Sequence, residues 1–245
     1  MRRYRISFLL GDRGQGSSFP MTSPVDASST PTGSGERPRL RGVFHQYAFL
    51  VFSALGVALV VTAPGAPERL AGGVFGGCLA LTFGVSALYH RVIWRPAARR
   101  LMRRLDHAAI FLLIAGTYTP YGLLVLAGAW RFSVLGIVWI GAALAIAQRL
   151  IWVDGPKWLA AVLAVGLGWV GIVAFPHVLG ATGSFGVLLL LAGGVLYTLG
   201  AVVYARRWPD PVPAVFGYHE LFHVLTILAA ASQYAAIAFF VLPSA

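Results

Sequence analysis

Seven long, continuously apolar runs dominate this sequence and restrict it to one kind of fold. Each run is close to the roughly 20 residues that a helix needs to cross a lipid bilayer. The runs lie at about residues 43–63, 71–94, 105–127, 130–150, 157–176, 185–205 and 218–241. Their side chains do not alternate between apolar and polar, as those of transmembrane β-barrel strands do. The sequence therefore predicts an all-α, polytopic membrane protein built as a bundle of seven transmembrane helices.

Composition supports a membrane protein and narrows the chemistry of any site. Hydrophobic residues make up 58% of the 245 residues and charged residues only 11%, whereas a soluble domain carries roughly 25% charged residues. The single cysteine, Cys78, lies inside the second apolar run. One cysteine excludes an intrachain disulfide and a zinc site built from cysteines.

The formal net charge of +11 comes from basic residues that gather on one predicted side of the membrane. Of 19 lysines and arginines, seven precede the first run, six lie between the second and third, and two flank each of the fourth–fifth and sixth–seventh connections. Only Arg69 and Arg131 fall on the other side. The positive-inside rule then places the N-terminus in the cytoplasm and the C-terminus outside. We interpret the basic excess as a topology signal, helped by anionic lipid headgroups at the cytoplasmic face, and not as a nucleic-acid site.

Two segments of different composition divide the chain. Residues 1–40 form a basic tail, rich in serine, glycine and proline, that we expect to be disordered and cytoplasmic. The apolar part of Met1–Leu10 is shorter than the roughly 7–15 residues of a signal peptide, and Met21 is a credible alternative start. Residues 41–245 form the membrane domain, with short connections and prolines at the ends of its runs.

Four ionisable side chains stand at run ends that the predicted topology places at one cytoplasmic depth. His90 lies near the end of the second run, and Asp106 lies at the start of the third. His219 and His223 lie at the start of the seventh. At about 1.5 Å of rise per residue, all four should lie within about 10 Å of the cytoplasmic surface. Because ionisable groups at membrane depth are costly unless they are paired or bound to a metal, the set marks a functional site. Six or eight helices would break this agreement in depth.

This set has the donor types and the spacing of a zinc site. His219 and His223 are four residues apart, so they share one helical face and can chelate one ion. Ser86 and His90 have the same spacing. Three histidines with an open fourth position are typical of catalytic zinc. Asp106 can bind the ion directly, or it can hold and deprotonate a zinc-bound water. The Ser86 hydroxyl can bind that water, a ligand or a developing oxyanion.

The members of the set also have simpler interpretations. His90 alone can be an interfacial histidine at a helix end, and Asp106 can pair with Arg103 or Arg104. His107 faces about 100° away from Asp106 and is interpreted as a residue behind the site or at the lipid interface. Two more histidines are interpreted as incidental: His45 and His177. The matching depths favour a metal site over these separate explanations.

The segment His219–His223 also matches the H-E-x-x-H pattern of zinc proteases, in which the glutamate is the catalytic base. Such a protease needs a third ligand further along the chain, yet no Asp, Glu or His follows between Val224 and Ala245. The third ligand would have to come from upstream, which breaks the protease pattern. We therefore favour a helix-interface role for Glu220 over proteolysis.

Four short segments, taken together, form a pattern specific enough to indicate a protein family. They are Ser-Ala-Leu-Tyr-His (86–90), Arg-Leu-Asp-His-Ala-Ala-Ile-Phe (104–111), Ala-Gly-Thr-Tyr-Thr-Pro (115–120) and Gly-Tyr-His-Glu-Leu-Phe-His (217–223). Together they resemble the bacterial hemolysin III family, within the progestin and adipoQ receptor (PAQR) group. The resemblance runs from about Arg41 to the C-terminus and implies seven helices with the N-terminus inside.

The resemblance also implies a site and a chemistry. It implies zinc on His90, His219 and His223, with Asp106 binding the zinc through water and Ser86 beside it. The wider group is linked to hydrolysis of lipid amides of the ceramide type, and some bacterial members to membrane-lipid homeostasis. The hemolysin name implies pore formation. The sequence offers no polar ring to line a pore, since its polar groups cluster at one end of the runs.

We expect a multi-pass plasma-membrane zinc hydrolase that cleaves an amide or ester bond of a membrane lipid. Asp106 would act as the base, Ser86 would steady the developing charge, and the apolar bundle would hold the acyl chain. Two alternatives stay open. One is a non-enzymatic membrane receptor or sensor with structural zinc, and the other is a pore-forming cytolysin or channel.

Overall fold

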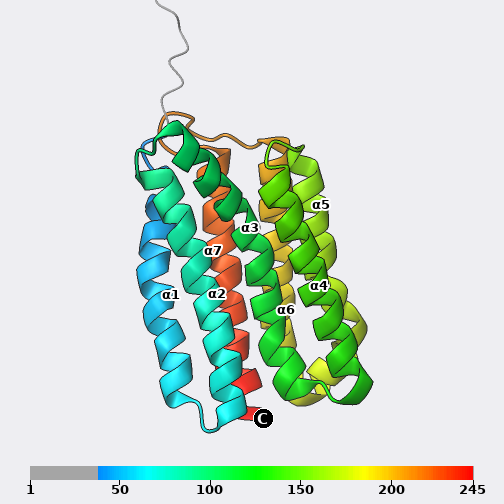
Figure 1. Ribbon diagram of the computed structural model, residues 1–245. Coiled ribbons are helices and arrows are strands. Elements are labelled where there is room, and N and C mark those ends of the chain that lie inside the picture. Colours follow the sequence, from blue (N-terminus) through cyan, green and yellow to red (C-terminus); the bar gives the residue numbers. More distant parts are fainter. Residues whose placement is uncertain (1–37, 245) are drawn as a thin grey trace, which may run out of the picture. The chain divides into compact units, whose positions relative to one another are not determined.

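Long helices make up most of the computed structural model, which describes residues 38–244. Its elements are α1 (Val43–Thr62), α2 (Ala66–Arg91), α3 (Pro96–Pro120), η1 (Tyr121–Val125), α4 (Gly128–Ile151), α5 (Lys157–Gly168), η2 (Val170–Ala174), α6 (Phe175–Arg206), α7 (Tyr218–Ala236), η3 (Ile237–Val241) and η4 (Leu242–Ser244). The helices stand side by side as a bundle with short connections (Figure 1). The prediction of an all-α, polytopic membrane protein is confirmed.

Six helical stretches in the described part are long and apolar enough to cross a membrane. One of them, Lys157–Arg206, has 50 residues and holds α5, η2 and α6, more than twice the roughly 20 that one crossing needs. Gly183 interrupts this stretch with φ 64° and ψ −176°. The chain folds back there. The two sides of the turn lie next to each other, as the hydrogen bond from Trp169 Nε1 to Thr198 Oγ1 at 3.0 Å shows. Seven crossings, with termini on opposite sides, stay predictions that this fold-back favours.

Several helices extend beyond the predicted apolar runs. α3 begins at Pro96 instead of about 105, because its first turns are rich in arginine, a good helix former that a search for apolar residues passes over. Pro96 occupies the first helical position, where its missing N–H costs nothing. α2 likewise begins at Ala66, with Pro67 in its first turn. Pro176 in the first turn of α6 starts a helix that continues well beyond it, whereas the sequence suggested an end there.

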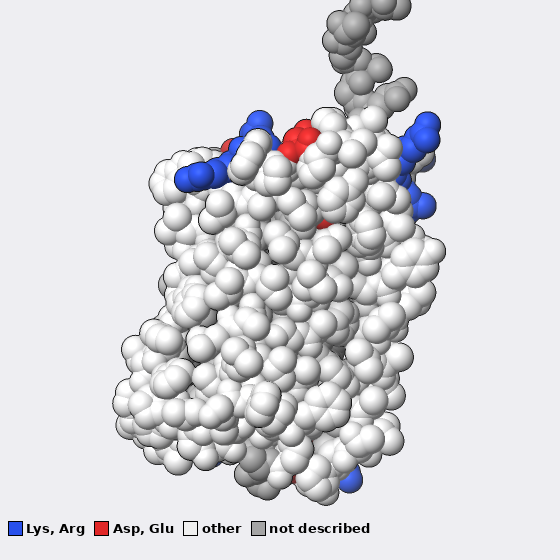
Figure 2. All heavy atoms as spheres, turned by 180° about the vertical axis from the view of Figure 1, so that it is seen from behind, with Lys and Arg blue, Asp and Glu red and all other residues white. Residues whose placement is uncertain are grey.

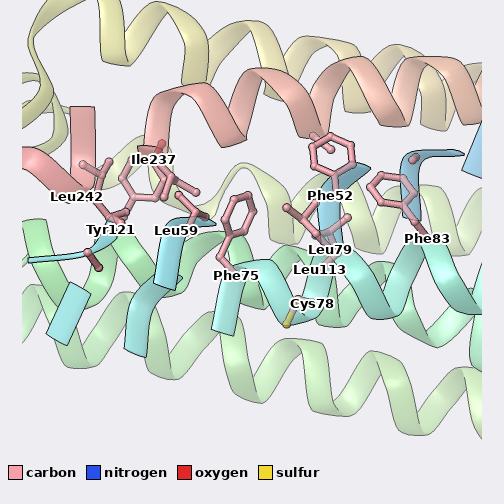
Figure 3. Packing of buried hydrophobic residues seen from close by; sticks show 14 of the residues in the cluster. Phe52, Leu59, Phe75, Cys78, Leu79, Phe83, Leu113, Tyr121, Ile237 and Leu242 are labelled. Atoms are coloured by element: carbon pink, nitrogen blue, oxygen red, sulfur yellow. The ribbon is translucent and has the colours of Figure 1, made fainter. Parts of the chain in front are cut away.

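The largest apolar core holds α1 and α2 against α7 and η3. Phe52 of α1, Phe75 of α2 and Ile237 of η3 are among its fully or nearly fully buried members (Figure 3). α1 and α2 also approach closely at two glycines: a Cβ added to Gly76 would lie 2.7 Å from the Cα of Gly56. Such close backbone contact is the usual use of small residues between membrane helices. It fixes α2, whose last turn carries His90, against α1.

One end of the bundle gathers the polar features. The C-terminal end of α2 and the N-terminal ends of α1, α3 and α7 meet there (Figure 1), and the lysines and arginines on the face shown in Figure 2 lie mainly at this end. The backbone N–H groups of Arg39 and Leu40 donate to the carbonyls of Ala214 and Val215 at 3.1 and 3.2 Å. The sequence predicted a tail over residues 1–40, but its last residues, Arg39 and Leu40, are joined to the folded domain. Residues 1–37 of that tail lie outside the described part.

Candidate metal site

Three imidazoles from two helices converge at this end. His90 lies in the last turn of α2, and His219 and His223 lie in the first two turns of α7. One ligand nitrogen from each ring lies within 4.8 Å of the other two, and His90 Nε2 is 3.2 Å from His219 Nε2. Two nitrogens bound at ~2.0–2.1 Å to one tetrahedral zinc ion lie about 3.3 Å apart. The rings thus have the spacing that a single ion requires.

Burial tests whether this donor set suits a metal. His223 is 1% exposed and His219 is 9% exposed, and His223 Nδ1 has no hydrogen-bond partner among residues 38–244. A buried polar atom without a partner costs about 1–3 kcal/mol. A metal ion is coordinated by the lone pair of a neutral imidazole nitrogen and requires no N–H donor from that nitrogen. Imidazole is a common zinc ligand. The residues present therefore fit zinc.

The orientation of α7 is fixed by its glutamate. Glu220 Oε2 accepts a hydrogen bond from the Gly217 N–H at 2.9 Å, and Glu220 Oε1 lies 2.6 Å from Arg41 Nε. The Glu220 side chain is fully buried. These contacts satisfy a free N–H at the helix start and tie α7 to the segment before α1. This geometry fits the helix-interface role expected for Glu220 and leaves the H-E-x-x-H base role without support.

Asp106 of α3 lies beside the imidazoles. Its Oδ2 is 3.8 Å from His90 Nε2, and its side chain is 12% exposed. The Asp106 carboxyl also forms a side-chain hydrogen bond with Ser86, one turn before His90 on α2. The alternative partner Arg103 instead forms an ion pair with Asp154. Asp106 is thus close enough to contact an ion on the rings, directly or through a water.

His45 of α1, which its sequence context alone does not assign to the site, lies next to it. Its ring stacks on that of His223, with centroids 3.7 Å apart and 16° between the planes. His45 is 3% exposed, and its ring also contacts the backbone of His223. Its depth was the available signal, because the first run also begins on the predicted cytoplasmic side.

The two remaining histidines lie further from the imidazoles. His107 Nε2 is 3.5 Å from the Tyr204 hydroxyl, so it faces α6, and it lines the same cavity as Asp106. His177 begins α6 and lies against Trp130, with ring centroids 5.1 Å apart. That places His177 near the N-terminal end of α4, at the other end of the bundle.

A largely apolar cavity extends from the site into the bundle. Ser86, Asp106, His219 and His223 line its polar end, and His45 joins them. Its other walls come from α3, α5, η2 and α6 and include Leu113, Ile114, Val165, Ile172 and Leu191. The cavity can therefore hold an apolar chain with one end presented to the imidazoles.

Comparison with known proteins places these residues in a shared segment. Residues 34–234 match a family model described as "Haemolysin-III related". "Hemolysin-3" of Bacillus cereus is 34% identical over 172 residues, which are 70% of this chain and 75% of that protein. "Hemolysin-3 homolog" of Bacillus subtilis is 29% identical over 167 residues, 68% and 75% of the two chains. "Heptahelical transmembrane protein 4" of Arabidopsis thaliana is 33% identical over 153 residues, which are 56% of this chain and 39% of that protein.

Proposed function

The chain belongs to the haemolysin-III-related family, and from that premise we propose that it is a multi-pass zinc protein of the plasma membrane that hydrolyses an amide or ester bond of a membrane lipid. One observation carries the proposal. Three imidazoles lie within ligand distance of one another at the polar end of an apolar cavity, with Asp106 beside them. The plasma membrane is inferred from the bacterial relatives.

Each group at the polar end has a place in such a reaction. The imidazoles of His90, His219 and His223 would hold zinc, which when bound would supply a Lewis acid for a carbonyl and a nucleophilic water near neutral pH. The Asp106 carboxylate takes a proton from the attacking water and returns it to the leaving nitrogen or oxygen. The Ser86 hydroxyl holds the carboxylate through their hydrogen bond. The apolar cavity orients the acyl chain and keeps bulk water away.

Asp106→Asn tests the chemistry apart from the metal. We expect the variant to retain its zinc and to lose about 10²–10⁴-fold in the rate of fatty-acid release from a ceramide-type amide in mixed micelles, since general-base catalysis contributes that much. Asp154→Asn removes a carboxylate at the same end of the bundle, 77% exposed, and should hydrolyse as wild type does. Equal rates in wild type and Asp106→Asn would remove Asp106 as the base. If zinc-loaded wild type releases no fatty acid, the proposal that the protein is a hydrolase is rejected.

A second function, a membrane sensor with structural zinc, is favoured by the way the ligands join α2 to α7. The imidazoles come from helices far apart in sequence and are half-buried or buried, so an ion there would couple those helices. In that case His219→Ala would lower the unfolding temperature in detergent, and no lipid product would form in wild type. A cytolytic function is suggested only by the names of two relatives, and ion flux from proteoliposomes would test it.

A further inference from the structure

A second cavity lies at the same end of the bundle, between α3, α4, α5 and α6, and its character is opposite to that of the first. Four cationic side chains line it: Arg103, Arg149, Lys157 and Arg207. Among the described residues that line it, Asp154 is the only carboxylate, and it forms an ion pair with Arg103. The remaining three cations therefore face the cavity without a carboxylate of their own.

Arg149, in the last turn of α4, carries most of the argument. The residue is 1% exposed. Its Nε donates to Gln148 Oε1 at 2.6 Å, while its Nη2 is buried without a hydrogen-bond partner in residues 38–244. A guanidinium out of water is costly unless an anion accompanies it. The cavity wall thus holds a buried cationic donor whose partner the chain does not supply.

The other cations approach the cavity from separate elements. Lys157 begins α5, and its Nζ donates to the Tyr218 hydroxyl at 3.0 Å and lies 4.5 Å from the centre of the Tyr204 ring. Arg207 is exposed at the C-terminal end of α6, where its φ of 55° turns the chain. Donors from several directions suit an anion with several oxygens. A phosphate has such oxygens, and arginine binds them through paired N–H groups.

We propose that this basic cavity binds a phosphate group. The group can come from a phospholipid headgroup or from free phosphate in solution. The arrangement of the two cavities favours the lipid as the source of the phosphate. His107 and Tyr204 line both cavities, so a headgroup held in the basic cavity lies next to the apolar cavity. Basic pockets between membrane helices on the cytoplasmic side are typical headgroup sites. Binding of phosphate does not depend on hydrolysis at the imidazoles.

Binding to detergent-purified wild type in phosphate-free buffer tests the site with two probes. Inorganic phosphate is titrated by calorimetry, and phosphatidylglycerol in mixed micelles is followed by native mass spectrometry. Arg149→Gln should weaken binding by about tenfold or more, since it removes a charge-assisted hydrogen bond. Arg100→Gln, which removes an exposed charge from the same end outside the cavity, should stay within about twofold of wild type. Size-exclusion profiles show whether each variant is folded.

Arg207→Asn is the second variant, in case Arg149→Gln fails to fold. It is exposed, and asparagine tolerates the left-handed backbone conformation at this position, so we expect a folded protein with several-fold weaker binding. Lipid binding without phosphate binding identifies the headgroup as the source, and binding of inorganic phosphate alone identifies the soluble anion. The proposal is overturned if wild type binds neither probe. It is also overturned if both cavity variants bind as Arg100→Gln does.

Discussion

The two arginines at opposite ends of α4 are used differently. In the first turn, Arg131 Nε donates to the carbonyls of Gly122 and Leu126 at 3.1 and 2.9 Å, which supplies donors to the chain just after α3. In the last turn, Arg149 has a buried Nη2 without a partner in the described residues. One end of the helix uses its cation to complete the fold, and the other presents its cation to a cavity.

The histidines divide between the two ends in the same way. His177 packs against Trp130 at the Arg131 end. At the Arg149 end, His223 and His45 are buried and stacked, and His223 Nδ1 lacks a hydrogen-bond partner in the described part of the chain. Polar groups left without partners by a folded chain indicate that something else binds them. The contrast between these cations and histidines supports the proposals that place both binding sites at the Arg149 end.

The largest effect should come from removing two imidazoles together. His219→Ala/His223→Ala leaves one ligand, so zinc content measured by mass spectrometry should fall from about one ion per chain to almost none. His177→Ala, at the other end, should keep the wild-type content. Zinc retained by the double variant would place the metal elsewhere. If wild type purified without chelators contains no metal, the proposed metal site is rejected.

The second-largest effect should be the loss of stability caused by Arg41→Gln. It leaves the fully buried Glu220 carboxylate without its ion pair, which costs about 3–5 kcal/mol for a buried pair. Thermal unfolding in detergent measures this loss. Arg39→Gln removes a nearby exposed charge and should change little. Arg41→Gln/Glu220→Gln should recover part of the loss, because no buried charge remains, and a double variant less stable than Arg41→Gln would contradict this account.

His45→Ala should weaken metal binding without abolishing it. Loss of the stacked ring frees His223 to rotate, and residues that orient a ligand typically contribute about 10–100-fold in metal affinity. Competition with a chromophoric chelator measures the affinity. His45→Phe keeps a ring against His223 and should bind nearly as wild type does. If the alanine and phenylalanine variants bind alike, the stack does not orient His223.

The smallest effect sharpens the comparison within α4. Arg131→Gln should cost about 1–2 kcal/mol, because hydrogen bonds to two backbone carbonyls are lost, and zinc content should not change. In phosphate-free buffer Arg149→Gln should unfold near the wild-type temperature, since removal of a buried charge offsets the loss of the hydrogen bond from Nε to Gln148 Oε1. Scanning calorimetry compares the two variants directly. A larger loss for Arg149→Gln than for Arg131→Gln would show that Arg149 has a structural role.

Depth along the apolar runs predicted four of the residues that meet at this site. His90 ends one run and His219 begins another, and a topology inferred from charge alone placed both at one surface. The structure brings these two residues, His223 and Asp106 together, although their roles at a metal stay predictions. The same reasoning failed to include His45, because an isolated histidine in an apolar run carries no spacing pattern, and its contact depends on how α1 packs on α7.

The basic cavity was beyond sequence analysis for a related reason. An arginine near the end of an apolar run is expected to be a topology signal in contact with water and headgroups. Whether Arg149 faces lipid, water or a neighbouring helix depends on the rotation of α4 about its own axis, which packing decides. The fold-back at Gly183 is similar: a positive φ at one glycine turns a 50-residue apolar stretch, while other glycines in that stretch stay helical.

The division of the imidazoles between α2 and α7 has a consequence for the order of biogenesis. His90 enters the membrane early in synthesis, and its two partners emerge only with the last long helix of the described chain. A nascent chain that has not yet produced Tyr218 offers a single imidazole of the three. Any ion held by all three can therefore be acquired only after α7 has inserted, so metal loading would act as a checkpoint for completed insertion.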